Sequence, residues 1–279
     1  MLLLRQESLL CYLVVSCFSI SCVRSLAAAP KREGVRQAVR DCLLDRYSDV
    51  PLSCTSISDM LRPSSPSFPT TPPLRQELFS SPLISVMYER ILPPLWSAGL
   101  RIGGPDAEYQ EAARFLRRPS KEASTTEVAL DLSCGTGFVG VRMAASQQWD
   151  HVFCLDYSPQ MLQECASTIR NQYDASLPLS IIRGDAGRLP FRDESLQAVH
   201  WGAAMHCVPD AEQALREVYR VLKPGGKLYA TTFLRPFPDV IFRFFTLPEL
   251  EQMTKRAGFD GMLQVEGRGV YGIIRATKG

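Results

Sequence analysis

The stretch VALDLSCGTGFVG, residues 128–140, governs the interpretation of the whole chain. An apolar run that contains Asp131 precedes a short loop of small residues, and a second apolar run follows. This order predicts a β-strand, a tight loop and the start of a helix. A serine, Ser133, stands where such loops more often carry a first glycine, so the stretch by itself also fits a simple turn.

The segments that follow alternate between short apolar runs and helical patterns. Further strands are predicted at 151–156, 179–185, 196–202 and 227–233, and helices at 138–148, 158–172, 210–222 and 247–259. Regular alternation of this kind predicts a doubly wound α/β fold with a mostly parallel sheet. The two last strands, within 262–277, are close in sequence and are expected to pair as an antiparallel hairpin.

Two helical patterns precede the first of these strands. One covers residues 82–100, and the other covers 105–119 with Asp106 as its expected N-cap. Together with the alternating part of the chain they delimit one domain from 77 to 279. The N-terminal helices are the expected walls of a site, since Tyr88 and Trp96 add aromatic rings there.

The N-terminal 76 residues differ in composition from this domain. Residues 1–29 combine Arg5, an apolar stretch and Ala27–Ala29, which is the layout of a secretory signal peptide. The apolar stretch is about 15 residues long and so is short for a membrane span, but an uncleaved anchor is the alternative. Residues 30–76 include a Pro-, Ser- and Thr-rich run and are expected to be a disordered leader or linker. Such a two-part leader is also consistent with onward delivery to a plastid.

Charge and cysteine content exclude several classes of function. The net charge of +2 is spread without a basic block, so a nucleic-acid partner is not expected. None of the nine cysteines forms a CxxC pair, so neither a zinc site nor any other metal site is expected. The cysteines outside the leader are interpreted as reduced and mostly buried.

Acidic and small residues follow the predicted strands at the edge where a parallel sheet binds ligands. Asp156 lies 25 positions after Asp131 and is suited to accept hydrogen bonds from ribose hydroxyls, although it could also cap the next helix. Asp185 follows the third strand and could accept from an adenine amine or simply form an Asx turn. Small residues around Ala203 and a histidine, His206, follow the fourth strand.

In this order the motifs ALDLSCGTG, LDYSPQML, RGDAGRLPF, AVHWGAAMHC and REVYRVLKPGGKL resemble those of class I S-adenosylmethionine (SAM)-dependent methyltransferases. The resemblance is to the subgroup with ubiquinone and menaquinone methyltransferases (methyltransferase type 11), and more specifically to plant plastid-type enzymes. It covers most of residues 80–275. It implies a Rossmann-like, mostly parallel seven-stranded sheet with an antiparallel last strand, and SAM as the cofactor.

The resemblance also implies roles for individual positions. The methionine part of SAM would be surrounded by the loop after the first strand, the ribose would bind Asp156, the adenine amine would meet Asp185, and the sulfonium would lie near the fourth strand. The cofactor-binding residues expected on this basis are Asp131, Ser133, Cys134, Gly135, Gly137, Asp156, Tyr157, Met161, Asp185, Ala186 and Ala203. The sequence also matches the G-x-G-x-x-G pattern of dinucleotide-binding proteins, but the later motifs have no role in that class.

The expected reaction is methyl transfer to a small, hydrophobic or aromatic acceptor. SAM supplies an activated methyl group, so the protein mainly aligns the acceptor and excludes water. His206 is the candidate base, the alternative being a histidine that only shapes the pocket. The phenylalanine-rich segment 233–246 suits an apolar acceptor. A SAM-binding protein without catalysis is the alternative function, peripheral contact with a membrane or lipid particle is a further hypothesis, and the oligomeric state is left open.

Overall fold

The computed structural model describes residues 29–61, 104–117, 126–173, 176–235 and 242–279. The chain divides into a unit of residues 1–34 and a compact unit of residues 35–279. The first unit is represented only by the start of helix α1 (Ala29–Asp41), so the description below concerns the second. Among the described residues no helix has the length and hydropathy to cross a bilayer. The expected signal peptide, apart from its last residue, and the expected helix at 82–100 lie outside the described residues.

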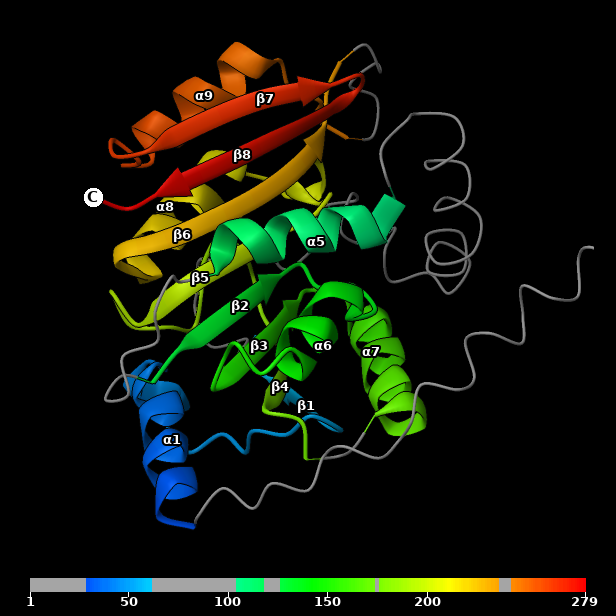
Figure 1. Ribbon diagram of the computed structural model, residues 1–279, viewed down its shortest axis with the longest axis vertical. Coiled ribbons are helices and arrows are strands. Elements are labelled where there is room, and N and C mark those ends of the chain that lie inside the picture. Colours follow the sequence, from blue (N-terminus) through cyan, green and yellow to red (C-terminus); the bar gives the residue numbers. More distant parts are fainter. Residues whose placement is uncertain (1–28, 62–103, 118–125, 174–175, 236–241) are drawn as a thin grey trace, which may run out of the picture. The chain divides into compact units, whose positions relative to one another are not determined.

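Eight strands of the described residues form one sheet in the order β1-β4-β3-β2-β5-β6-β8-β7 (Figure 1). Their bounds are β1 Ile57–Asp59, β2 Val128–Leu132, β3 His151–Asp156, β4 Leu179–Arg183, β5 Leu196–Trp201, β6 Leu222–Phe233, β7 Leu263–Arg268 and β8 Tyr271–Thr277. The strands β1 to β6 run parallel to one another, whereas β8 runs antiparallel to both β6 and β7. The predicted α/β fold, its antiparallel last strand and the C-terminal hairpin are therefore confirmed.

The strand count differs from the expected seven because the segment before residue 62 adds β1. Strand β1 pairs with β4 at the edge of the sheet, where Ile57 lies opposite Ile181. Upstream of it, Leu43 is fully buried and forms a backbone bridge with Phe191. The expectation of a disordered leader across 30–76 is thus wrong for residues 35–61, since their apolar side chains add to the core. The Pro-rich run that motivated it lies at 62–75, outside the described residues.

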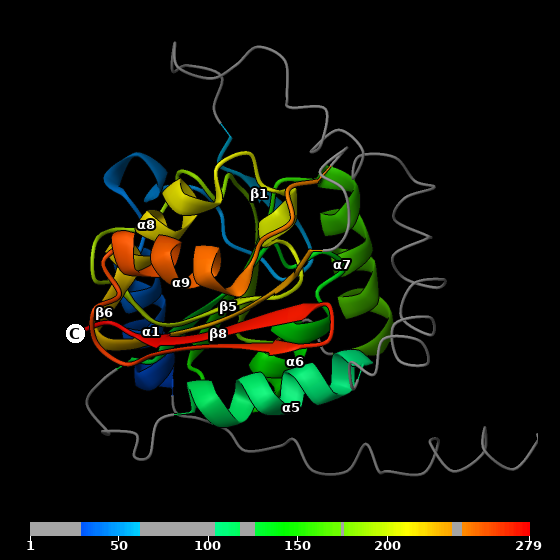
Figure 2. The same ribbon diagram turned by 90° about the horizontal axis from the view of Figure 1, so that it is seen from above.

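Helices cover both faces of the sheet and produce two apolar cores. Their bounds are α5 Gly104–Leu116, α6 Phe138–Ala145, α7 Pro159–Gln172, α8 Ala211–Val221 and α9 Leu247–Arg256. Side chains of α1, α8 and α9 pack in one core, and those of α5, α6 and α7 pack in the other. Figure 2 shows α8 and α9 on one side of the sheet and α5 and α6 on the other. Strand β2 contributes Val128, Leu130 and Leu132 to the first core and Ala129 to the second, as its period of two requires.

The order of the strands reverses between β2 and β5. From β2 the chain builds toward β3 and β4 on one side, and β5 begins the other side. Ligands of open α/β sheets bind beyond the carboxyl ends of the strands at such a switch point. The residues that follow β2, β3, β4 and β5 therefore define the region to examine.

Candidate functional site

The loop between β2 and α6 adopts an unusual backbone. Ser133, Gly135 and Gly137 all have left-handed φ angles, of 54°, 55° and 84°. The N–H of Cys134 donates to the Leu155 carbonyl at 3.0 Å, which fixes the loop to strand β3. Alternating backbone conformations of this kind gather N–H groups into anion-binding concavities. Ser133 therefore adopts a left-handed backbone conformation although it has a side chain. This conformation costs about 1–2 kcal/mol relative to glycine.

The glycines at 137 and 140 are required by close packing beneath this loop. A Cβ atom on Gly137 would lie 2.4 Å from the Cys165 sulfur, and one on Gly140 would lie 2.3 Å from the Cys154 sulfur. The close approach lets the Gly140 N–H donate to Asp131 Oδ2 at 2.7 Å. The dinucleotide-like spacing of the sequence is thus explained by the close packing of Gly137 on α7 and of Gly140 on β2 and β3.

Cys134, Cys154 and Cys165 pack together in the second core below the loop. None of the six cysteines in the described residues forms a disulfide. Burial raises the pKa of the Cys134 thiol, so it is neutral at physiological pH. Cys134 is consequently a packing residue of the loop rather than a nucleophile.

Asp156 ends β3 and connects this strand to the loop. Its carboxylate accepts the Gly135 N–H at 2.9 Å and the Ser158 N–H at 2.8 Å. Burial raises its pKa to about 6, and these hydrogen bonds and that of Tyr157 oppose the rise. Helix α7 is capped by Ser158, which accepts from the Met161 N–H. Because Ser158 already serves as the cap, the partly exposed carboxylate of Asp156 can receive further donors.

The remaining predicted residues on this side lie at the ends of β3 and β4. Met161 is buried and Tyr157 is partly buried, with the Arg183 guanidinium 6.0 Å from its ring centre. Asp185 accepts the Gly187 N–H at 2.9 Å, so it forms the Asx turn that was the alternative for it. Ala186 is buried in the first core. Asp185 keeps one carboxylate oxygen outside this turn bond.

A buried charged group that the sequence did not predict lies at the switch point. Asp131 and His200 face each other from β2 and β5, with Asp131 Oδ1 2.7 Å from His200 Nδ1. On the other side of the imidazole, Glu108 of α5 places Oε1 3.6 Å from Nε2. Burial alone would lower the pKa of His200, but the two carboxylates raise it to about 9. His200 is therefore an imidazolium between two carboxylates.

Hydroxyl groups complete the environment of Glu108. The Thr231 hydroxyl donates to Oε1 at 2.7 Å and the Tyr271 hydroxyl donates to Oε2 at 2.8 Å. Burial alone would raise the pKa of Glu108, but His200 and the two hydroxyls bring it below its ordinary value. Only the Asp131 position carried a sequence signal, because the other members come from strands and a helix far apart in the chain.

The residues after β5 separate into two environments. Ala203 has a φ of 47° and its N–H donates to the Thr231 hydroxyl at 2.8 Å, beside the charged group. Strain of this kind is frequent where a backbone is shaped for a ligand. His206 lies in the short helix η3 (Met205–Cys207) and is buried among aromatic rings. The ring centres of Phe233 and Phe244 lie 5.2 and 5.8 Å from that of His206.

Burial lowers the pKa of His206 to about 4. The imidazole is thus neutral at pH 7, with Nδ1 3.4 Å from the Thr232 hydroxyl oxygen. A neutral ring can accept a proton, but its basicity is low. The phenylalanine-rich segment supplies part of this environment, and its residues 236–241 lie outside the described residues.

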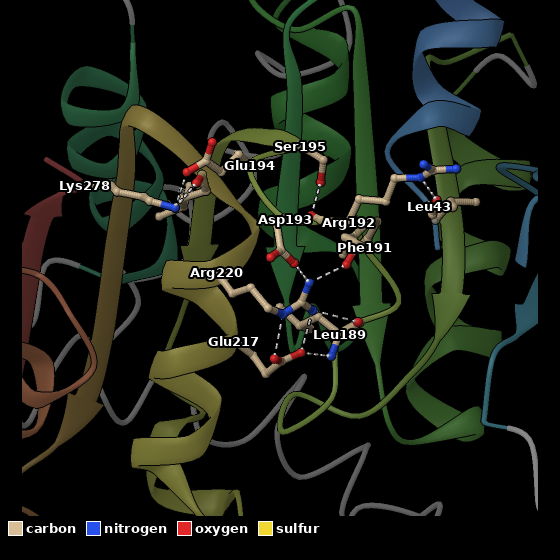
Figure 3. Close-up of polar contacts among 11 residues, drawn as sticks. Leu43, Leu189, Phe191, Arg192, Asp193, Glu194, Ser195, Glu217, Arg220 and Lys278 are labelled. Atoms are coloured by element: carbon tan, nitrogen blue, oxygen red, sulfur yellow. Dashed lines mark hydrogen bonds and ion pairs between the residues drawn. The ribbon is translucent and has the colours of Figure 1, made fainter. Parts of the chain in front are cut away.

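Two other sequence motifs serve the scaffold. Arg220 of α8 donates to the carbonyls of Leu189 and Phe191 and to the carboxylates of Glu217 and Asp193 (Figure 3). Glu217 in turn accepts the Leu189 N–H at 2.7 Å. The motif REVYRVL therefore fastens the loop of the motif GRLPF to helix α8. These contacts lie at the amino end of β5, opposite the edge at which ligands are expected.

Comparison with known proteins agrees with the expected family. Residues 130–230 match the family described as "Methyltransferase domain". Two uncharacterized chloroplastic methyltransferases of Arabidopsis thaliana are 40% identical over 172 residues (60% of this chain, 46% of the relative) and 33% identical over 228 residues (74% and 61%). A demethylmenaquinone methyltransferase of Lactobacillus johnsonii is 40% identical over 129 residues (46% and 52%). The chain thus spans about half to three-fifths of the length of these relatives.

Solved structures support the fold at low sequence identity. Phosphoethanolamine N-methyltransferase 2 of Haemonchus contortus, solved with S-adenosylhomocysteine, aligns with a TM-score of 0.58 at 18% identity and covers 76% of this chain and 61% of that one. The [4+2]-cyclase SpnF aligns with a TM-score of 0.57 at 17% identity (75% and 97%). The second match illustrates that the fold alone does not fix the reaction. The motifs, the sheet order and the matching domain agree in their likeness to the class I SAM-dependent methyltransferases, and this likeness supports SAM as the cofactor.

Proposed function

We propose that this protein transfers a methyl group from SAM to a small hydrophobic or aromatic acceptor. The observation that carries the proposal is the set of groups at one edge of the sheet: the left-handed loop after β2, Asp156 after β3 and Asp185 after β4. Asp156 joins two of these elements through its bond to the Gly135 N–H. The succession of the loop after β2, Asp156 after β3 and Asp185 after β4 on adjacent strands supports their assignment to the methionine part, the ribose and the adenine of SAM.

We assign each of the residues predicted from the sequence to one part of the cofactor. We assign the ribose hydroxyls to Asp156, with Tyr157 and Met161 beside the adenosine, and the adenine amine to Asp185 with the Ala186 backbone. The methionine part is assigned to Asp131 and to the loop from Ser133 through Cys134 and Gly135 to Gly137, and the sulfonium side to Ala203. The strained backbones of Ser133 and Ala203, at the ends of the adjacent strands β2 and β5, support this division.

The acceptor side is assigned to the aromatic residues around His206. SAM supplies an activated methyl group, so the protein has to align an acceptor atom and exclude water. His206 is kept as the candidate base, and its neutral state at pH 7 is compatible with accepting a proton from a phenol or an enol. His206→Ala with unchanged turnover would remove this role and leave only that of a pocket wall.

Binding and turnover of the full chain test the proposal. Calorimetric titration with SAM is expected to give a saturable isotherm, and labelled SAM with a pooled lipid and quinone extract is expected to give a labelled product. Binding without a product across a broad extract would favour a catalytically inactive SAM-binding protein. No binding at all would refute both functions.

We further propose that the N-terminal residues direct the protein to a plastid. Two of the relatives described above are named chloroplastic. Because residues 35–61 belong to the fold, a fluorescent protein fused after residue 34 isolates the candidate targeting segment. Plastid fluorescence is the expected result, and retention in the secretory route or at a membrane would contradict it. Sedimentation of the purified chain with vesicles tests the hypothesis of membrane contact.

A further inference from the structure

The buried group at the switch point contains more negative than positive charge. Asp131 and Glu108 each contribute a carboxylate, and His200 contributes one imidazolium. Among the residues that the structure describes, no lysine or arginine forms an ion pair with either carboxylate. Within the described part of the chain one negative charge is thus left uncompensated, and burying such a charge is unfavourable unless a cation balances it.

One member of this group is open to a ligand. The side chains of Asp131 and His200 are 2% and 3% exposed, whereas that of Glu108 is 16% exposed. His200 Nε2 is buried without a hydrogen-bond partner in the described part of the chain. The excess negative charge is therefore accessible through the Glu108 side chain, whereas the unpaired Nε2–H of His200 is a donor and is no partner for a cation.

Gly202, at the end of β5, packs closely against this group. A Cβ atom on Gly202 would lie 3.0 Å from Glu108 Oε1 and 2.7 Å from the His200 ring. Any larger residue at this position would therefore displace the carboxylate or the imidazole. Gly202 directly precedes the strained Ala203, so this corner belongs to the ligand-binding edge of the sheet.

The corner formed by Gly202 and Glu108 lies at a separation from Asp156, the carboxylate assigned to the ribose, that suits the length of SAM. Asp156 ends β3, and β5 is two strands away across β2. Neighbouring strands are about 4.8 Å apart, which gives roughly 10 Å between the two strand ends. An extended SAM molecule covers this span from its ribose to the amino-acid end. That end carries an ammonium group, the cation that the corner lacks.

We propose that Glu108 binds the α-ammonium group of the methionine part of SAM. The proposal rests on the cofactor site proposed above and adds a binding residue from helix α5. Thr231 and Tyr271 fix the carboxylate by donating to separate oxygens, which leaves acceptor capacity on each. The positive ammonium group then balances the negative charge that the His200 imidazolium does not compensate.

Helix α5 also offers a matched control. Glu111 lies one turn further along the same helix, and its carboxylate is paired with Arg268 at 2.7 Å and with Arg275. It anchors α5 to β7 and β8 and already has its cations. Glu111→Gln therefore perturbs the attachment of the helix without removing the carboxylate assigned to the ligand.

The test compares ligands that contain the ammonium group with one that lacks it. The full-length wild type, Glu108→Gln and Glu111→Gln are titrated calorimetrically with SAM, S-adenosylhomocysteine and 5′-methylthioadenosine, which has no amino-acid part. Glu108→Gln should weaken the binding of SAM and of S-adenosylhomocysteine by about tenfold to a hundredfold, as expected for the loss of a hydrogen bond to a charged group. Its affinity for 5′-methylthioadenosine should stay within about twofold of the wild type. Glu111→Gln should leave all three affinities near those of the wild type.

Each other outcome overturns the inference. Unchanged SAM binding in Glu108→Gln refutes the assignment while the proposed function stands. An equal loss for 5′-methylthioadenosine means that Glu108 acts through the scaffold. Absence of binding in the wild type refutes the proposed function itself. If Glu108→Gln does not fold, the wild type is titrated with S-adenosylhomocysteine and its desamino analogue, and equal affinities for the two also overturn the inference.

Discussion

Two charged groups lie at opposite ends of β5, and they are built in different ways. At the amino end, Arg220 is paired with two carboxylates and two backbone carbonyls, and its side chain is 28% exposed. At the carboxyl end, His200 is buried between Asp131 and Glu108, and its Nε2–H has no hydrogen-bond partner among the residues that the structure describes. The first group satisfies its polar atoms, and the second does not.

The difference distinguishes a structural contact from a binding site. A satisfied network holds a loop and has nothing left to offer a ligand. A buried network with excess negative charge is unfavourable by itself and is stabilised by a cation that balances the charge. The comparison predicts that changes at Arg220 affect stability alone, whereas changes at the other end also affect cofactor binding.

Replacement of Arg220 should have the largest effect on stability. Arg220→Ala leaves the Leu189 and Phe191 carbonyls without this donor, and the Glu217 carboxylate keeps only its hydrogen bond from the Leu189 N–H. We expect the free energy of unfolding in urea to fall by about 3 kcal/mol, below the upper values for buried pairs because the side chain is partly exposed. The exposed Arg216→Ala on the same helix, paired with Glu212, should cost less than about 1 kcal/mol. A weakened SAM affinity in folded Arg220→Ala would contradict the comparison.

The imidazolium at the other end should make stability depend on alkaline pH. The folded pKa of His200, about 9, exceeds the unfolded value near 6.5, so folding takes up a proton between these values. The resulting stabilisation is fully present below pH 6.5 and is lost as pH rises through 9. We expect a loss of about 2 kcal/mol between pH 7 and 9.

His200→Gln isolates this contribution from that of other groups. Burial raises the pKa of Tyr229, which stacks on His200, and that of Tyr271, so neither phenol ionises in this range. The pH dependence of urea unfolding should therefore flatten in the variant. A wild-type slope that persists in His200→Gln would show that His200 is neutral in the folded protein.

The sequence predicted which residues lie at the ends of the strands, but it did not predict which side chains contact them. Strands β2 and β3 have the predicted bounds, because their apolar runs are bounded by turn residues. The positions of Asp131 and Asp156 near the carboxyl ends of these strands could therefore be predicted from the sequence. Glu108 could not be found in this way, since it comes from a helix and its partners are set by the tertiary packing of β6 and β8.

Composition was misleading where a short polar segment adds to an existing core. Residues 35–61 were expected to be disordered because a Pro-rich run follows them. Their few apolar residues, such as Leu43 and Met60, gain stability only from the sheet that the rest of the chain provides. No local sequence pattern predicts the stability that a segment gains by packing against the sheet. His206 shows the same limit, since the rings around it come from β6 (Phe233) and from the segment that contains Phe242 and Phe244, both distant from it in the chain.

Asp156 should matter for binding more than for stability. Asp156→Ala removes the acceptor assigned to the ribose, and we expect SAM binding to weaken by about 1–3 kcal/mol. Since the pKa of the unliganded carboxyl is about 6, wild-type affinity should also fall by up to tenfold per pH unit below pH 6. Calorimetry from pH 5 to 8 measures both effects. Unchanged affinity in the variant would refute the ribose assignment.

The smallest effects are expected at two left-handed residues, one in each region. Ser133 (φ 54°) lies in the cofactor loop, and Glu194 (φ 52°) lies beside the Arg220 group, where it pairs with Lys278 at 3.3 Å. Replacement by glycine relieves the same backbone strain at both positions, so Ser133→Gly and Glu194→Gly should each raise the unfolding free energy by about 0.5–1 kcal/mol. The Glu194 side of the lost ion pair is exposed, and the buried Lys278 keeps its hydrogen bond to the Leu222 carbonyl, so the loss offsets little.

Cofactor affinity then separates the two substitutions. Ser133→Gly removes a hydroxyl that can donate to the methionine carboxylate and lets the loop sample other conformations, so SAM binding should weaken by a few fold. Glu194→Gly should leave SAM binding unchanged, because its region has no group assigned to a ligand. Equal affinities in both variants would mean that the serine is a tolerated substitute for glycine and that its strain serves no binding function.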